Sequence, residues 1–213
     1  MARRLVIVGG DAAGMSAAAQ ARRMTSAGEL EIVAFERGSR TSYAACGLPY
    51  LVGGLVDTPE LLIARTPEQH RANGIDVRIH HEVTAIDTMA LTMTVRDLET
   101  GSDSVEQYDE LLIGTGASGI APPWPGIDAE GVLQLRTLDD AAEVERRLDA
   151  GARRAVVVGA GYIGLEVAEG LLERGLEVTV VERLDVPMGA SSRSTTVTSR
   201  PRSSRPSATS SPM

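Results

Sequence analysis

The sequence has few of the residues that cross-link chains or fill aromatic cores. Its 213 residues include one Cys, one Trp and one Phe, and aromatic residues make up 3% of the chain. A single cysteine excludes an internal disulfide, which suits a reducing compartment but leaves the thiol open to exchange with a partner from outside the chain. Lysine is also missing, so all 21 basic residues are arginine, which we attribute to a GC-rich gene.

Long apolar runs are missing too. No run reaches the roughly 18 residues of a membrane span, and the N-terminus passes into a strand-like segment without the apolar region of a signal peptide. These absences predict a cytoplasmic protein with no membrane partner.

What is present is typical of a soluble α/β protein, since 43% of the residues are hydrophobic and 22 are Gly. The formal net charge is −8, and segment 191–213, which contains Arg but no acid, leaves the remaining body more acidic still. An acidic body is unsuited to a polyanionic backbone, so we expect no nucleic-acid partner.

The N-terminal stretch has the pattern of a βαβ unit that binds a dinucleotide. A strand-like run, Arg4–Gly9, leads into a small-residue helix expected to end near Ala27, and a second run, Glu29–Glu36, ends on an acid. Backbone N–H groups at the helix start would hold a pyrophosphate, and Glu36 would accept a hydrogen bond from a ribose hydroxyl. The fingerprint is imperfect because Asp11 replaces its second glycine. The turn consists of Gly9, Gly10, Asp11, Ala12, Ala13 and Gly14.

The same pattern returns later in the chain with a complete fingerprint. A strand-like run, Ala155–Val158, precedes the G-x-G-x-x-G motif at Gly159–Gly164, and a helix, Leu165–Arg174, and a strand, Leu176–Glu182, follow it. Glu182 favours a free 2′-hydroxyl and hence NADH, whereas Arg183 beside it keeps NADPH open.

The region between the two motifs is expected to hold a short helix and a β-meander. Thr66–Gly74 has a helix cap, Pro at the first helical position and a closing Gly. Residues 76–115 alternate in a way that predicts a meander inserted into the first α/β domain. Its strand-like stretches are Asp76–His80, Glu82–Ile86, Leu91–Arg96 and Leu111–Thr115. His80 and His81 would face opposite sides of a strand, so we expect no metal site there or elsewhere.

A stiff Pro-rich segment, Pro122–Gly126, marks the predicted domain boundary. Beyond it Thr137 is expected to cap a helix, Leu138–Leu148, with acids in its first turn. The sequence thus predicts two Rossmann-like domains, 1–120 and 121–189, and a tail, 190–213.

The lone cysteine, Cys46, stands in a context that favours reactivity. By default a lone cysteine is a small buried hydrophobe. Here Gly47 removes bulk beside the sulfur and Pro49 suits the first turn of a helix, so Cys46 is expected near a helix N-terminus, where the dipole favours thiolate. Two dinucleotide motifs together with a thiol predict electron transfer from nicotinamide to flavin and then to sulfur. A duplicated domain with one inert copy is the alternative.

The nonapeptide Ser42–Tyr50, taken with these motifs, resembles the flavin-dependent pyridine nucleotide-disulfide oxidoreductases. It is most similar to their single-cysteine branch, which contains coenzyme A disulfide reductase, NADH oxidase and NADH peroxidase, and the resemblance runs from Met1 to about Gly189. It implies that Cys46 faces the flavin as a charge-transfer thiolate and becomes a mixed disulfide with coenzyme A or a sulfenic acid.

The resemblance also implies which residues hold the cofactors. FAD would lie on the first turn and Glu36, and NAD(P)H on the second turn. The further implied contacts are Arg37, Val83, Thr115, Gly116, Gly159, Gly161, Tyr162, Ile163, Gly164, Glu166 and Glu182.

A substrate site along the first helix is implied as well. Arg22 and Arg23 could pair with coenzyme A phosphates, since guanidinium suits phosphate, although a solvated helix face is the alternative. Peroxidase-type members carry a histidine at the position of Ala12, so peroxide chemistry is disfavoured, and Ala45 departs from the Asn frequent in the coenzyme A group. The implied substrate residues are Ser16, Gln20, Arg23, Ser42 and Arg71.

The predicted function is therefore FAD-dependent reduction of a low-molecular-weight disulfide or persulfide, such as coenzyme A disulfide, by NAD(P)H through Cys46. One alternative is an NADH oxidase that reduces oxygen through a cysteine sulfenic acid. Another is a non-catalytic nucleotide-binding fragment.

The tail, 190–213, departs from the resemblance. It is rich in Ser, Thr, Arg and Pro and buries too little surface to offset its ordering entropy, so we expect disorder. We interpret it as a shifted reading frame or a misjoined end. The resemblance implies that full-length relatives are homodimers and that the dimerisation domain is missing here. A parallel sheet cut after its second βαβ strand leaves an apolar edge and helix faces uncovered, so we expect this chain to be marginally stable, to retain FAD weakly and to turn over little.

Overall fold

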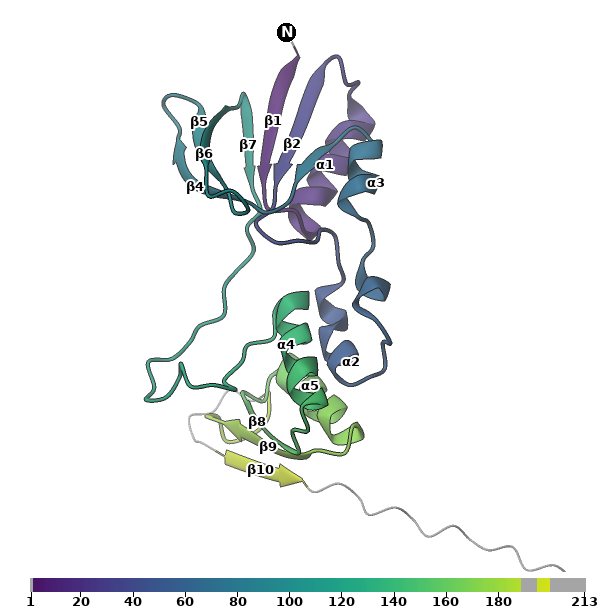
Figure 1. Ribbon diagram of the computed structural model, residues 1–213, viewed down its shortest axis with the longest axis vertical. Coiled ribbons are helices and arrows are strands. Elements are labelled where there is room, and N and C mark those ends of the chain that lie inside the picture. The colour runs from purple at the N-terminus through teal and green to yellow at the C-terminus, as the bar shows by residue number, and fades with distance from the viewer. Residues whose placement is uncertain (1, 189–194, 200–213) are drawn as a thin grey trace, which may run out of the picture. The chain divides into compact units, whose positions relative to one another are not determined.

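The computed structural model describes residues 2–188 and the backbone of Thr195–Ser199 (Figure 1). It divides into two compact units. Unit 1 comprises Met1–Ala44 and Glu60–Pro122, and unit 2 comprises Ala45–Pro59 and Pro123–Met213. Segment Ala45–Pro59 belongs by sequence position to the first predicted domain, but it packs with unit 2, where its short helix buries an apolar side.

Unit 1 is built on a four-stranded parallel sheet in the order β3-β2-β1-β7. Its strands are β1 (Arg3–Val8), β2 (Leu30–Phe35), β3 (Asp76–Arg78) and β7 (Glu110–Ile113). The helix after β1, α1 (Ala12–Met24), ends before Ala27 because Thr25 turns to an extended backbone and its hydroxyl donates to the Ala21 carbonyl. The short helix α3 (Pro67–Ala72) begins at the predicted cap, Thr66, which forms a capping box with Gln69.

The meander is a separate antiparallel sheet in the order β4-β5-β6. Its strands are β4 (His81–Asp87), β5 (Thr92–Asp97) and β6 (Asp103–Gln107). The assignment of all of 76–115 to the meander is wrong, because β3 and β7 pair within the parallel sheet. The sequence also missed β6, whose residues are almost all polar.

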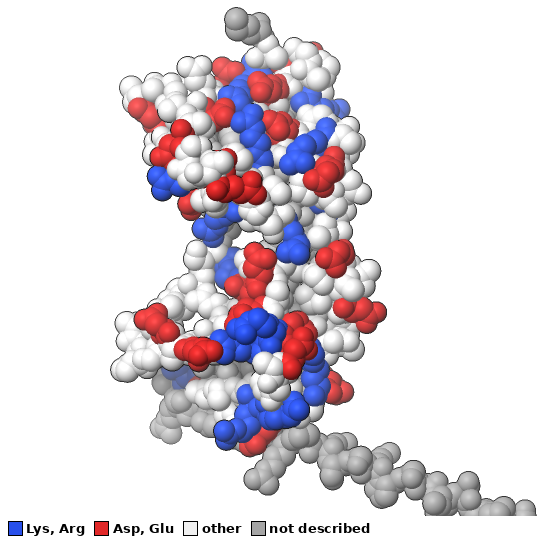
Figure 2. Space-filling view, viewed as in Figure 1, with Lys and Arg blue, Asp and Glu red and all other residues white. Residues whose placement is uncertain are grey.

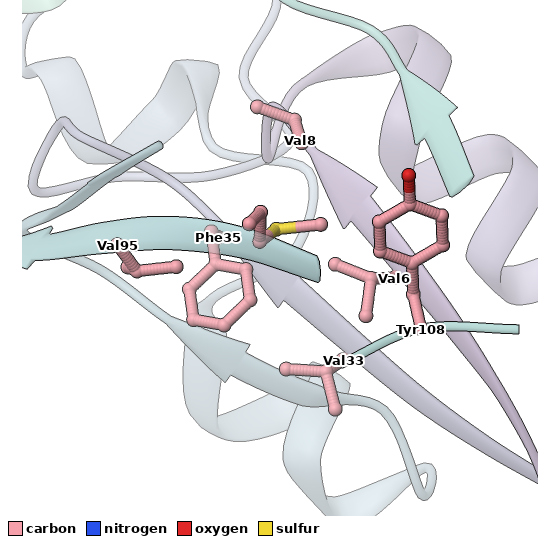
Figure 3. Packing of buried hydrophobic residues seen from close by; sticks show 7 residues of the cluster. Val6, Val8, Val33, Phe35, Val95 and Tyr108 are labelled. Carbon is pink, nitrogen blue, oxygen red and sulfur yellow. The ribbon is translucent and has the colours of Figure 1, made fainter. Parts of the chain in front are cut away.

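The parallel sheet of unit 1 carries a core on each face, because side chains alternate along β1 and β2. The face toward the meander packs residues from both sheets, six of which are labelled in Figure 3, namely Val6, Val8, Val33, Phe35, Val95 and Tyr108. The face toward α1 packs Ile7, Met15, Ala18, Ile32, Ala34, Ile75 and Val77. Both faces are thereby covered, as a parallel sheet requires.

Unit 2 repeats the βαβ arrangement. The parallel strands β8 (Arg154–Val158) and β9 (Glu177–Glu182) are joined by α5 (Tyr162–Glu173), and α4 (Leu138–Asp149) precedes them with the predicted Thr137 cap. The prediction of an α/β fold with two such units is confirmed.

Of the tail, 190–213, for which disorder is expected, the structure describes the backbone of Thr195–Ser199. Their backbone forms β10, which pairs antiparallel with β9. The β-branched residues of this stretch suit a strand. The rest of the tail lies outside the described residues.

The expected absences concern membranes, metals and nucleic acid. Within the described residues no helix is both long and apolar enough to cross a bilayer, and no cluster of three His, Cys, Asp or Glu could hold a metal ion. His80 lies just before β4 with φ +57°, so a bend, not strand alternation, separates it from His81. On the face shown in Figure 2 acidic and basic side chains are interspersed.

Candidate functional site

The first glycine turn joins β1 to α1 and leaves no room for side chains. A Cβ on Gly14 would collide with the Gly9 carbonyl, and one on Gly9 would collide with the Gly114 carbonyl. Gly9 also has φ +108°, which only glycine adopts readily. This packing sets the start of α1, at Ala12 and Ala13, directly against the end of β1.

Asp11 is the N-cap of α1 but does not cap the helix with its side chain. Its carboxylate Oδ1 instead accepts a hydrogen bond from the Tyr43 backbone N–H at 3.3 Å. Burial raises the pKa of Asp11, and Glu36 adds to the rise against hydrogen bonds that lower it. The N–H groups at the start of α1 are thus free of a side-chain cap, which fits an external anion such as a pyrophosphate.

The second glycine turn has the same shape. Gly159 has φ +103°, and a Cβ on Gly164 would collide with the Gly159 carbonyl. Gly161, by contrast, faces open space and is an N-cap without a side-chain cap. The exposed residues Tyr162 and Ile163 begin α5 there, so its first N–H groups have room for a pyrophosphate.

The two strand-end acids make equivalent contacts in the two units. Glu36 accepts hydrogen bonds from the N–H groups of Gly10 and Gly38, both at 2.7 Å. Glu182 accepts them from Ala160 at 2.6 Å and Leu184 at 2.9 Å, and these bonds lower its pKa. Each carboxylate is therefore held over its glycine turn by two backbone N–H groups, with lone pairs left for a ribose hydroxyl.

The other predicted cofactor residues lie in both units. In unit 1 Thr115 lies beside the first turn, because its N would be 3.3 Å from a Cβ on Gly9, and Gly116 follows with φ +68°. Val83 lies on β4 of the meander and packs against the core cluster between the two sheets of unit 1, and Arg37 is exposed. In unit 2 Glu166 is half-buried on α5.

Cys46 is exposed, so the alternative of a buried structural cysteine is wrong. It lies in a single 3-10 turn (Ala45–Gly47) directly before α2 (Leu48–Val52), and Pro49 occupies the first turn of that helix, as predicted. The thiol therefore precedes a helix N-terminus and is accessible to a reagent in solution.

The helix after Cys46 is fixed to α5 of the same unit. Gly53 and Gly170 cross so closely that a Cβ on either would lie 2.7–2.9 Å from the Cα of the other. Arg174 donates to the Val52 carbonyl at 3.1 Å and pairs with Glu145 at 2.6 Å. The cysteine segment is thus attached to the helix that follows the second glycine turn.

A pocket of about 410 Å³ lies within unit 1, along α1. This α1 pocket is within the size range of small-molecule sites. One helix face supplies Ala12, Ser16, Ala19 and Arg23, which recur at helical spacing. The full lining is Asp11, Ala12, Met15, Ser16, Ala19, Arg23, Ser42, Tyr43, Ala44, Ala64, Arg65 and His70.

The structure brings three of the five predicted substrate residues to the α1 pocket, namely Ser16, Arg23 and Ser42. Gln20 is outside the lining but accepts hydrogen bonds from the Arg23 guanidinium. Arg71 donates to the Val77 carbonyl and pairs with Glu68, so it is not brought into the pocket.

Arg22, which the sequence grouped with Arg23 as a phosphate ligand, has a different role. Its guanidinium donates to the Leu30 carbonyl at 2.7 Å and the Gly74 carbonyl at 3.2 Å. These bonds tie α1 to β2 and to the turn after α3.

Sequence reasoning missed Arg65 and His70, which also line the α1 pocket. His70 lies at the end of α3, and its Nε2 is 2.9 Å from Ser42 Oγ. Burial lowers the pKa of His70, and the charge of Arg65 lowers it further, so its ring is neutral at neutral pH. The spacing of Pro67 and His70 places both on one buried face of α3, but nothing in the pattern reveals that this face lies against Ser42.

Comparison with known proteins relates these features to one family. A family model described as pyridine nucleotide-disulphide oxidoreductase matches residues 3–199. The chain is 37% identical to an NADH oxidase of Enterococcus faecalis and 36% identical to a coenzyme A disulfide reductase of Staphylococcus haemolyticus, over 85% of this chain and 40% of each relative. It is 40% identical to the solved NAD-dependent persulfide reductase from A. fulgidus, with a TM-score of 0.81, over 85% of this chain and 34% of that one.

The chain spans about 40% of the length of the curated relatives it matches. The family model covers both glycine turns, the cysteine segment and β10, and so extends past Gly189, where the sequence resemblance was expected to end. The chain belongs to the pyridine nucleotide-disulphide oxidoreductase family.

Proposed function

We propose that the chain carries the nucleotide-binding and thiol elements of an FAD-dependent NAD(P)H:disulfide oxidoreductase. Its substrate is a low-molecular-weight disulfide or persulfide, and coenzyme A disulfide is the first candidate. The observation that carries the proposal is the α1 pocket, whose arginines and Ser42 suit a phosphate-bearing ligand, and whose lining includes Ala44, two residues before Cys46 in the chain.

The cofactors follow from the two glycine turns. FAD would be held at the first turn, where Glu36 would accept from its ribose and Thr115 and Gly116 would flank it, and NAD(P)H would be held at the second turn, where Glu182 would accept from its ribose. The open space at Gly161 and the uncapped start of α1 support this assignment. A bound flavin supplies two-electron exchange between the nicotinamide and a thiol.

The chemistry on the protein side belongs to Cys46. Its thiolate attacks one sulfur of the substrate disulfide, a new sulfur–sulfur bond forms, and the other half leaves as a thiolate that takes a proton from solvent. Two electrons and a proton derived from NAD(P)H then restore Cys46 and release the second thiol. Overall, NAD(P)H, a proton and one disulfide give NAD(P)⁺ and two thiols.

An NADH oxidase is the second candidate, favoured by the 37% identity to a relative of that name. NADH consumption distinguishes the candidates when flavin absorbance is followed in the same sample. Under argon, coenzyme A disulfide should drive NADH loss if the proposal holds, whereas an oxidase needs oxygen alone. A chain that binds nucleotide but consumes NADH in neither condition would be a non-catalytic fragment, and the rate measures the low turnover that the sequence predicts.

Arg23 and Arg22 form a matched pair for testing the substrate. Arg23→Ala should weaken coenzyme A binding about 5-fold, the value of an exposed ion pair of roughly 1 kcal/mol, without lowering the stability of the chain. Titration calorimetry measures the affinity and urea unfolding measures the stability.

Arg22→Ala should lower the stability of the chain and leave its affinity for coenzyme A unchanged. The hydrogen bonds of Arg22 to the Leu30 and Gly74 carbonyls hold the fold together and do not face the ligand. Equal coenzyme A affinities in the two variants would mean that the α1 pocket does not receive the ligand's phosphates.

A further inference from the structure

His70 is buried in the wall of the α1 pocket, with 2% of its surface exposed. One ring nitrogen, Nε2, meets Ser42 Oγ at 2.9 Å. The other, Nδ1, is buried and makes no hydrogen bond within the described part of the chain. A buried ring nitrogen without a partner destabilises a fold, so its presence here calls for a reason other than stability.

The unpartnered Nδ1 decides the tautomer of His70. Its ring is neutral, so one nitrogen carries the proton and the other a lone pair. A buried N–H without an acceptor costs more than a buried lone pair without a donor, which places the proton on Nε2. Nε2–H therefore donates to Ser42 Oγ, and the Ser42 hydroxyl keeps its own proton for another acceptor.

Ser42 is held in an unusual backbone conformation around this bond. Its φ is +50°, a region that is unfavourable for a residue with a side chain and persists only where the surroundings enforce it. Its N–H donates to the Gly10 carbonyl at 3.1 Å, and its carbonyl accepts from the Ala64 N–H at 2.8 Å. Backbone and side chain are thus both fixed, and the hydroxyl lies at the α1 pocket.

The charges of the pocket indicate what the hydroxyl meets. Arg23 and Arg65 add guanidinium donors to the lining, and Asp11 has a raised pKa and is already bonded to the Tyr43 N–H. A hydroxyl donor in a pocket that also holds two guanidinium groups suits an acceptor-rich anion, such as a phosphate oxygen.

We propose that His70 is a positioning residue of the α1 pocket, which orients the Ser42 hydroxyl as a hydrogen-bond donor to a phosphate of the bound thiol or disulfide. This inference rests on the proposed function, because it takes the ligand to be of the coenzyme A type.

Two isosteric variants of His70 distinguish the contributions of its two ring nitrogens to coenzyme A binding. His70→Gln places an amide N–H near the position of Nε2 and should preserve binding, whereas His70→Asn places its amide near Nδ1 and should not. With His70→Phe, which removes both, coenzyme A binding measured by titration calorimetry should weaken about 10- to 100-fold, the range for a hydrogen bond to a charged group. Binding of pantetheine, which lacks phosphate, should change less than 2-fold in every variant.

Ser42→Ala supplies the coupling test. The double variant with His70→Phe should bind coenzyme A no more weakly than Ser42→Ala alone, because His70 acts through the serine. Additive losses, or equal losses for coenzyme A and pantetheine, would overturn the inference and leave His70 with a structural role only.

Nitrogen NMR of the histidine rings decides the tautomer without any ligand. The chain has three histidines, and His70→Gln assigns the signal. A neutral ring protonated on Nε2 is expected, and a proton on Nδ1 would contradict the inference. If the unaltered chain binds neither thiol, the proposed function fails for this pocket. If it binds coenzyme A and His70→Phe binds equally well, only the role of His70 fails.

Discussion

Replacing Cys46 with serine should abolish covalent capture of coenzyme A by this chain. The unaltered protein, mixed with coenzyme A disulfide, should gain the mass of one coenzyme A per chain, because Cys46 is exposed and is the single cysteine of the sequence. Serine has no sulfur with which to form the mixed disulfide, so the mass should not change. Intact-mass spectrometry gives this result from one reaction cycle and does not depend on turnover.

The rate at which Cys46 forms the mixed disulfide with coenzyme A tests whether its surroundings make it reactive. A control variant, Cys46→Ser with Ser102→Cys, moves the thiol to an exposed turn without a helix behind it. Its capture should be at least about 10-fold slower, because Cys46 precedes α2 and lies near the α1 pocket lining in the chain. Equal rates for the two thiols would show that exposure alone explains the formation of the mixed disulfide. The proposed role of Cys46 as the reactive thiol would then be contradicted.

The two glycines of the second turn should respond to alanine in opposite ways. A Cβ on Gly161 meets no atom within 4 Å, and its φ of −78° suits alanine, so Gly161→Ala should change the free energy of unfolding by less than about 1 kcal/mol. That Cβ would, however, enter the open space in which the proposed function places the pyrophosphate. NADH affinity should fall on the order of 100-fold, as for the loss of hydrogen bonds to a charged group.

Gly164→Ala should destabilise the protein by about 3 kcal/mol, because its Cβ would collide with the Gly159 carbonyl. Urea unfolding and NADH fluorescence titration measure the two effects separately. The exposed Gly28, which faces open space, provides a neutral alanine control for both. Unchanged NADH affinity in Gly161→Ala would contradict the proposal that NADH binds at this turn.

Local chemistry made much of this fold predictable. Thr66 and Thr137 cap helices because a hydroxyl followed three residues later by a Gln or Asp suits a capping box wherever the chain places it. The glycine turns are equally local, since a positive φ at Gly9 and Gly159 is a property of those residues. The sheet to which each strand belongs was harder to predict. In sequence, β3 and β7 resemble the meander strands, and only their pairing assigns them to the parallel sheet.

The sequence by itself determined the two glycine turns, their strand-end acids and the position of the cysteine before a helix, because each depends on neighbours in the chain. The tertiary structure alone decided that Arg23 lines the α1 pocket while Arg22 does not, that Arg71 is engaged elsewhere, and that His70 lies behind Ser42. These are contacts between side chains and segments distant in sequence. They depend on how α1, α3 and the Ser42 segment pack on one sheet, which no local pattern encodes.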